Sequence, residues 1–390
     1  MSLQLVKAGY IPLVDAAPLI VAKELGFAEE EGLSLALEAA PSWSTLRDLL
    51  AFGQIQAAHM LSPVPVASAL GLLAGLPRLN ALMVTSANGN VFGLSSDMTK
   101  RLLDAGFGFD LHDAKVAGQA IATLPRPLRI GVPFALSMHA ELVTMWLTHL
   151  GLTTGQDFHI QAVPPPLMTA AIERRELDGF CVGEPWGSIT VERAAGSLVL
   201  PTAAIWSSAP EKVLAVRESW AEENDETVSG LMRAVWRACC WLSDEKNLTM
   251  AAEVLSTGAY LGINSEVIDR ALSGRFIINS TGDMRRVENF LRFEGNGVCF
   301  PWLSQGRWIA ERLSQRYGLP ETADLAAASQ VFRTDLYRKH LFPIGAEMPL
   351  RSSKIEGALT QPTEVSTVSG SMILGRDRFF NDEIFDPSAE

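Results

Sequence analysis

Short apolar runs alternate with amphipathic stretches along the first part of the chain, and this order limits the possible folds more than any other feature. The predicted elements are a strand at 3–13, a helix at 15–27 closed by Gly26, a strand at 33–40, a helix at 42–53 and a strand at 55–61. Strands and helices in strict alternation predict a parallel sheet that is covered on both faces by helices.

The alternation resumes later in the chain as a second, similar unit. Its predicted elements are a strand at 127–133, a helix at 134–151, a strand at 158–166, a helix at 167–179 and a strand at 180–186. The segment 95–128 is mixed, 220–256 and 301–318 are predicted to be helical, and the last 40 residues show little periodicity. Two similar α/β lobes follow, with a tail that wraps one lobe or is partly mobile.

Composition excludes several classes of protein. With 48% hydrophobic and 19% charged residues, 390 residues can bury a substantial core, and a net charge of -12 disfavours direct binding of nucleic acid or anionic membranes. No apolar run is long enough to span a membrane, and the first residues enter a strand rather than a leader. Four cysteines without CxxC spacing suit a reducing compartment, so we expect a cytoplasmic protein. A periplasmic protein whose leader was removed is the alternative.

Catalytic and metal-binding motifs are missing from the sequence. It has no GxSxG, HExxH or P-loop motif and no GxGxxG after a strand. Carboxylates and cysteines do not gather at metal-ligand spacings. We therefore expect a protein that is not an enzyme, with no cofactor and no metal.

Several motifs occur together in a characteristic order. They are GYIPLVDAAPLIVAKELGFAEEEGL, APSWSTLRD, AAHMLSPVPVA, VPPPLMTAAIERRELDGFCVGEPW and PEKVLAVRESWAEEN. In this order, over about residues 5–320, the chain resembles the nitrate/bicarbonate-binding family of solute receptors, which includes NrtA-type proteins. The resemblance implies a type II periplasmic-binding-protein fold with a ligand cleft between two lobes. It places lobe I at 1–93 plus 205–340, lobe II at 94–204 and the tail at 341–390.

Within this family, the AAHML and GLSSDMTKRL segments and the lack of a leader look most like NasS-type cytoplasmic sensors. The resemblance then implies a nitrate/nitrite sensor that holds an RNA-binding, NasT-like antiterminator inactive. The alternative is the solute-binding component of an ABC transporter for nitrate, bicarbonate or a sulfonate, whose partner is a membrane permease.

Nitrate only accepts hydrogen bonds, so its receptor needs donors and one positive charge, away from carboxylates. Three residues fit best: Trp43 before a predicted helix, His139 in the first turn of another, and Lys212 directly before the apolar run Val213–Val216. The family places ligand contacts at each of these motifs. Taken from the residues alone, Trp43 could pack a loop against the core, and His139 could be a surface or capping histidine. Lys212 could pair with Glu211 or be solvated in a loop.

Weaker candidates lie at other predicted strand ends. They are His59 and Ser62 in AAHMLSP, the stretch Thr85–Asn90 with Asn88 and Gly89, and the pair Gly183 and Glu184. Transport members of the family more often carry Gln near the first two segments, so the match there is looser. An ionised Glu184 would repel an anion, and we expect it to orient a neighbour such as Lys212 or to belong to the connection between the lobes.

Overall fold

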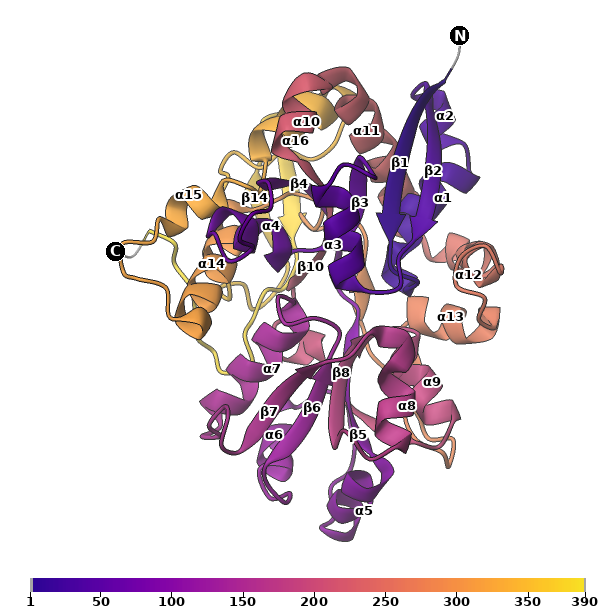
Figure 1. Cartoon of the computed structure of the whole chain (residues 1–390), viewed down its shortest axis with the longest axis vertical. Coiled ribbons are helices and arrows are strands. Elements are labelled where there is room, and N and C mark those ends of the chain that lie inside the picture. The colour runs from indigo at the N-terminus through magenta and orange to yellow at the C-terminus, as the bar shows by residue number, and fades with distance from the viewer. Residues whose placement is uncertain (1–2, 389–390) are drawn as a thin grey trace.

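The computed structural model describes residues 3–388 and shows two lobes, each built on one β-sheet (Figure 1). Lobe I has a six-stranded sheet in the order β13-β4-β10-β3-β1-β2, and lobe II a five-stranded sheet in the order β7-β6-β8-β5-β9. None of the described helices is both long and apolar enough to cross a membrane.

The strands of lobe I are β1 (Gln4–Tyr10), β2 (Leu33–Ala39), β3 (Ala57–Leu61), β4 (Leu79–Asn88), β10 (Pro210–Arg217) and β13 (Leu291–Arg292). Those of lobe II are β5 (Asn90–Ser95), β6 (Leu128–Val132), β7 (Phe158–Ala162), β8 (Gly179–Gly183) and β9 (Gly196–Pro201). Two small hairpins consist of β11 (Arg275–Ile277) with β12 (Met284–Arg286), and β14 (Thr363–Ser366) with β15 (Ser371–Leu374).

Helices surround both sheets. The first half of the chain contributes α1 (Ala17–Glu24), α2 (Phe27–Glu30), α3 (Trp43–Ala51), α4 (Pro63–Ala69), α5 (Ser96–Asp104), α6 (Ala114–Ile121), α7 (Met138–His149), α8 (Met168–Glu173) and α9 (Trp186–Glu192). The second half contributes α10 (Glu218–Glu223), α11 (Asp225–Leu242), α12 (Leu248–Ser256), α13 (Ser265–Leu272), α14 (Leu303–Tyr317), α15 (Leu325–Ser329) and α16 (Thr334–Leu341). Short 3-10 turns include η1 (Val14–Ala16) and η3 (Thr202–Ala204).

The prediction of purely parallel sheets is wrong for one central strand in each lobe. β10 runs antiparallel to β3 and β4, and β5 runs antiparallel to β8 and β9, whereas β1 pairs in parallel with β2 and β3. β5 and β10 are each the first strand after the chain crosses from the other lobe. Each enters its sheet at the edge where the parallel strands end, so it must run against them. The edge strand β13 also pairs antiparallel with β4, although it does not follow a crossing.

The two crossings lie side by side between the sheets. The first is the single residue Gly89 between β4 and β5, and the second runs from Pro201 through η3 to Pro210. β5 thus begins at Asn90, earlier than the predicted lobe boundary at residue 94. The predicted lobe ranges remain a proposal, but the sheets assign residues 90–93 to the lobe II sheet.

Local sequence explains why the elements that frame the cleft begin where they do. Ser42 caps α3 by accepting a hydrogen bond from the Thr45 amide at 3.2 Å, and Ser137 caps α7 in the same way from the Ala140 amide at 3.2 Å. A hydroxyl in this position satisfies one of the free amides of the first turn. The two caps place Trp43 and His139 in the first turn of their helices.

The C-terminal tail lies along the second crossing. The Phe380 amide donates to the Ile205 carbonyl at 2.8 Å, and the Ser207 amide donates to the Arg378 carbonyl at 2.9 Å. The tail also reaches lobe II, where Asn381 Nδ2 lies 3.1 Å from His149 Nδ1. The tail therefore contacts both the crossing and the second lobe.

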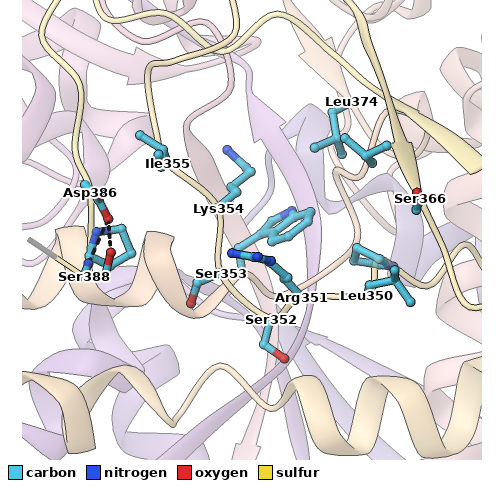
Figure 2. A pocket seen from close by; sticks show the side chains of 14 residues that line it. Leu350, Arg351, Ser352, Ser353, Lys354, Ile355, Ser366, Leu374, Asp386 and Ser388 are labelled. Atoms are coloured by element: carbon cyan, nitrogen blue, oxygen red, sulfur yellow. Dashed lines mark hydrogen bonds between the residues drawn. The ribbon is translucent and has the colours of Figure 1, made fainter.

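A buried charge cluster fixes the tail to lobe I. Lys354 Nζ makes ion pairs with Glu356 and Asp377, and the Trp206 indole donates to Asp377 at 2.5 Å. Lys354 also lines a pocket of about 710 Å³ formed mainly by the tail, with Leu374 and Ser366 on one side and Asp386 and Ser388 on the other (Figure 2).

Candidate functional site

Lys212 lies at the centre of a buried cluster between the lobes. It is the third residue of β10. The sequence had indicated that the strand begins after Lys212, but the strand begins two residues before it. Its side chain is fully buried, and its register partners are Leu61 on β3 and Ser86 on β4. Entry from the other lobe places this end of β10 at the sheet edge that faces lobe II.

Asp15 and His59 lie on the lobe I side of this lysine. Lys212 Nζ is 2.7 Å from Asp15 Oδ2, and His59 Nε2 is 3.3 Å from Asp15 Oδ1. Asp15 belongs to η1, directly after β1, and His59 belongs to β3. Adjacent parallel strands end at the same sheet edge, which brings these two side chains together.

Glu211 joins the cluster to lobe II. Its Oε1 atom lies 3.0 Å from Lys212 Nζ and 3.2 Å from Nδ1 of His139, which is carried by α7. Both the His139 and the Glu211 side chains are fully buried. Residues of both lobes are therefore in contact in this structure, and the cleft is closed around them.

An aromatic side chain covers the lysine. Lys212 Nζ lies 5.6 Å from the ring centroid of Trp43, within range of a cation–π attraction. The ring of His59 lies 6.1 Å from that of Trp43 and is tilted to it by 42°. Trp43 is 1% exposed, so its indole presents a flat apolar face and one N–H inside the cluster.

The pKa values of the cluster follow from burial and from these contacts. Burial opposes ionisation of Asp15, but Lys212 and His59 outweigh it and hold the pKa of Asp15 well below its usual range. Burial would lower the pKa of Lys212, but Asp15 and Glu211 raise it. Lys212 and Asp15 are therefore a charged pair at neutral pH.

The remaining titratable groups of the cluster are less readily charged. Burial raises the pKa of Glu211, which Lys212 offsets only in part. Burial lowers the pKa of His59, and burial together with Lys212 lowers the pKa of His139 well below its usual value. Both imidazoles are therefore neutral at pH 7 and offer one N–H and one acceptor nitrogen each.

Many polar atoms of the cluster lack a hydrogen-bond partner among the described residues. They are Nε1 of Trp43, both ring nitrogens of His59 and His139, both amide atoms of Asn90, both oxygens of Asp15 and Oε2 of Glu211. Some of these atoms lie within ion-pair distance of an oppositely charged or polar group, as His59 and Lys212 do with Asp15 and His139 does with Glu211, but the contacts lack the alignment of a hydrogen bond. Leaving a buried polar group unpaired costs about 1–3 kcal/mol, so this number of them in one place is typical of a binding site.

Other predicted site residues serve the connection between the lobes. Asn88, with φ 62°, donates from Nδ2 to the Ser207 carbonyl at 3.0 Å and accepts from the Ala209 amide at 3.2 Å. The Gly89 amide donates to the Phe290 carbonyl at 2.8 Å. These bonds tie the two crossings to each other and to lobe I. Asn88 and Gly89 therefore do not belong to the lysine cluster of Asp15, Trp43, His59, His139, Glu211 and Lys212.

Ser62, Gly183 and Glu184 also have structural partners. The Ser62 hydroxyl donates to the Pro210 carbonyl at 2.7 Å, and Gly183 pairs with Asn90 between β8 and β5. The buried Glu184 carboxylate accepts from the Ser188 amide at 3.3 Å in the first turn of α9. Among its described hydrogen bonds and ion pairs none involves Lys212, so the expected orienting role is not what this geometry provides.

Sequence reasoning missed one carboxylate of the cluster. Asp15 was not among the candidate site residues, whereas Glu211 was considered as a partner of Lys212 but not as a contact of His139. The expectation that a receptor keeps carboxylates away from its lysine is wrong here, because a fully buried ammonium needs opposite charge to stay ionised. That requirement, with Asp15 directly after a strand of the same sheet, was the available signal.

Comparison with known proteins identifies the class. Residues 2–256 match the NMT1-like family. The chain belongs to this family. Among similar proteins, the nitrate/nitrite binding protein NrtA of Synechococcus elongatus is 30% identical over 372 residues, which cover 91% of this chain and 81% of the relative. The nitrate import ATP-binding protein NrtC of Synechocystis is 32% identical over 310 residues, 79% of this chain and 45% of the relative.

A solved structure supports the same assignment. The crystal structure of the periplasmic nitrate-binding protein NrtA from Synechocystis superimposes with a TM-score of 0.84 at 26% identity, over 99% of this chain and 96% of that chain. The predicted fold, a periplasmic-binding-protein architecture of two α/β lobes, is confirmed. The predicted family, a group of nitrate/bicarbonate-binding receptors, is confirmed as well.

Proposed function

We propose that this protein is a non-enzymatic receptor that closes its two lobes around nitrate or nitrite. The observation that carries the proposal is the buried lysine cluster, in which side chains of both lobes carry N–H groups that make no hydrogen bond within the described residues. Lys212 supplies a fixed positive charge, and Trp43, His59 and His139 supply N–H groups and an aromatic face. A planar monoanion that only accepts hydrogen bonds suits these donors.

Closure gives the receptor its mechanism. His139 belongs to lobe II, whereas Glu211 and Lys212 belong to lobe I, and His139 Nδ1 lies 3.2 Å from Glu211 Oε1. Contacts from both lobes to one ligand can exist together only in the closed form. Because the anion binds the closed form more tightly than the open form, its binding shifts the population toward the closed form. The size of the shift depends on the difference between the two affinities.

We further propose that closure controls an RNA-binding antiterminator, as in the NasS-type sensors that the AAHML and GLSSDMTKRL segments resemble. In that role the protein is cytoplasmic, and closure changes the surface that the antiterminator meets. A second candidate role is delivery of the anion to an ABC permease from the periplasmic side. The names of the relatives NrtA and NrtC favour this second role.

Calorimetry with nitrate, nitrite, bicarbonate and an alkanesulfonate tests the ligand. We expect saturable binding of nitrate or nitrite with the highest affinity. Lys212→Met should weaken nitrate binding by about 2–4 kcal/mol, because a buried charged hydrogen bond is lost. The matched control is Lys7→Met, which removes an exposed lysine from the same sheet and should bind normally. A clear isotherm with the sulfonate alone would show that the ligand is wrong.

The two roles predict different partners. A sensor should retain the purified antiterminator on a column without nitrate and release it when nitrate is added. A transport receptor should instead stimulate the ATPase activity of its permease complex in nitrate-loaded form. Release that does not depend on nitrate, or no retention at all, would remove the sensor role and leave the transport role to be tested directly.

A further inference from the structure

A second cavity lies away from the lysine cluster, where four segments of the chain meet. Its volume is about 760 Å³, within the range of small-molecule sites. It is lined by the start of α6 in lobe II, the second crossing around η3, the segment 286–296 after β12, and the tail at 375–382. None of the lysine-cluster residues lines it.

Three arginines line this cavity, and none of them makes an ion pair within the described residues 3–388. Arg286 and Arg376 are exposed. Arg292 is more buried; it donates from Nη2 to the Gly295 carbonyl at 3.0 Å, and Asp377 and Glu294 stabilise its charge from longer range. Three unpaired guanidinium groups around one cavity are unexpected in a protein with a net charge of -12.

The acidic residues of the lining do not cancel this charge. Asp113 accepts a hydrogen bond from the Val116 amide at 3.0 Å and caps α6. Asp382 is shared by Arg378 and Lys115, the latter at 3.5 Å. Only the exposed Glu288 remains to balance the three free arginines. The cavity therefore has a surplus of positive charge.

We propose that this cavity is a second anion site, for a small molecule with two or more phosphate or carboxylate groups. Planar guanidinium groups bind such oxyanions through paired N–H donors, and several arginines around one cavity can engage several groups of one ligand. Nitrate, with a single charge, would leave most of these donors without an acceptor. Because both lobes and the tail line the cavity, its ligand contacts all three.

Calorimetry with inorganic pyrophosphate and with citrate tests the proposal on the full-length chain. Pyrophosphate represents phosphates and citrate represents carboxylates. We expect saturable binding of at least one probe, weakened about tenfold by Arg286→Ala and by Arg376→Ala. Arg101→Ala on α5 is the matched control, since it removes the same charge from an exposed helix outside the cavity and should leave binding unchanged.

Trp43→Phe distinguishes this site from the lysine cluster, because it keeps the charges and the apolar face of the cluster and should bind pyrophosphate or citrate as the unaltered protein does. Three results would overturn the proposal. They are no saturable binding of either probe, equal weakening by Arg101→Ala and the cavity variants, and weakened probe binding in Trp43→Phe. Failure of nitrate to bind the protein would leave this second site unaffected.

Discussion

Replacing Glu211 by glutamine tests how the cluster accommodates an anion beside two carboxylates. In this structure the charge of Lys212 is shared by Asp15 at 2.7 Å and Glu211 at 3.0 Å. Lys212 and His59 keep Asp15 ionised, whereas burial raises the pKa of Glu211. Of the two carboxyl groups, Glu211 is therefore the one that takes up a proton more readily when nitrate binds beside Lys212.

The expected size of the effect follows from these distances. An anion oxygen bonded to Lys212 at about 2.8 Å would lie roughly 5 Å from the Glu211 carboxylate. With an effective dielectric constant of about 20, two like charges at that separation repel by roughly 3 kcal/mol. Glu211→Gln removes this repulsion while Asp15 still pairs with Lys212. At a pH where Glu211 is ionised, nitrate affinity should rise by up to about a hundredfold.

The sign of the pH dependence is determined by the same group. Bound nitrate favours the protonated form of Glu211, so binding takes up a proton, and affinity in the unaltered protein should fall as pH rises. Calorimetry at about pH 5 and about pH 8 should show this fall, and Glu211→Gln should abolish it. Burial lowers the pKa values of His59 and His139, so both imidazoles contribute little in this range.

Glu141→Gln is the matched control. Burial raises the pKa of Glu141 to about 7, but its carboxylate lies 2.9 Å from Arg316, outside the cluster. This variant should keep the pH dependence of the unaltered protein. If Glu211→Gln kept it too, or bound nitrate less tightly at about pH 8, the reasoning about Glu211 would be refuted.

Three further predictions follow from other parts of the structure. Trp43→Phe keeps the apolar face but removes a buried N–H, and calorimetry should show nitrate affinity reduced by about 1 kcal/mol; unchanged affinity would exclude the indole from the site. Lys354→Met leaves the buried Asp377 carboxylate, whose pKa Lys354 holds below its usual value, without its ion-pair partner. Urea unfolding should report a loss of about 3–5 kcal/mol, and a loss below about 1 kcal/mol would contradict the assignment. Burial raises the pKa of Glu141 and of Glu184 to about 7, so both groups bind protons more tightly when folded. Measured relative to Glu141→Gln or Glu184→Gln, the free energy of unfolding of the unaltered protein should fall between about pH 5 and about pH 8 by at most about 3 kcal/mol per group, and a relative rise would have the wrong sign.

Local pattern together with the family resemblance placed the residues that carry the positive charge and the N–H donors. Helix starts and strand ends offered Trp43, His59, His139 and Lys212 as candidates, and the resemblance favoured a ligand role over the alternatives that the residues alone left open. The structure brings all four into one buried cluster. Their contact with a ligand remains a prediction. Asn88 was selected by the same reasoning, but its amide joins the two crossings. The position of Asn88 at the end of a strand does not reveal that the backbone of the second crossing lies within reach of its side chain.

The two-lobed α/β class could be predicted from the amino-acid sequence, because the alternation of apolar runs and amphipathic stretches is a local property of each segment. The sequence also indicated that β10 is buried, from the run Val213–Val216. The directions of β5 and β10 became apparent from the fold, since direction depends on where each crossing enters a sheet. The fold also placed Asp15 beside Lys212 and Glu211 beside His139. A buried ammonium needs counter-charge, and which distant residue supplies it depends on which strand ends meet at the sheet edge.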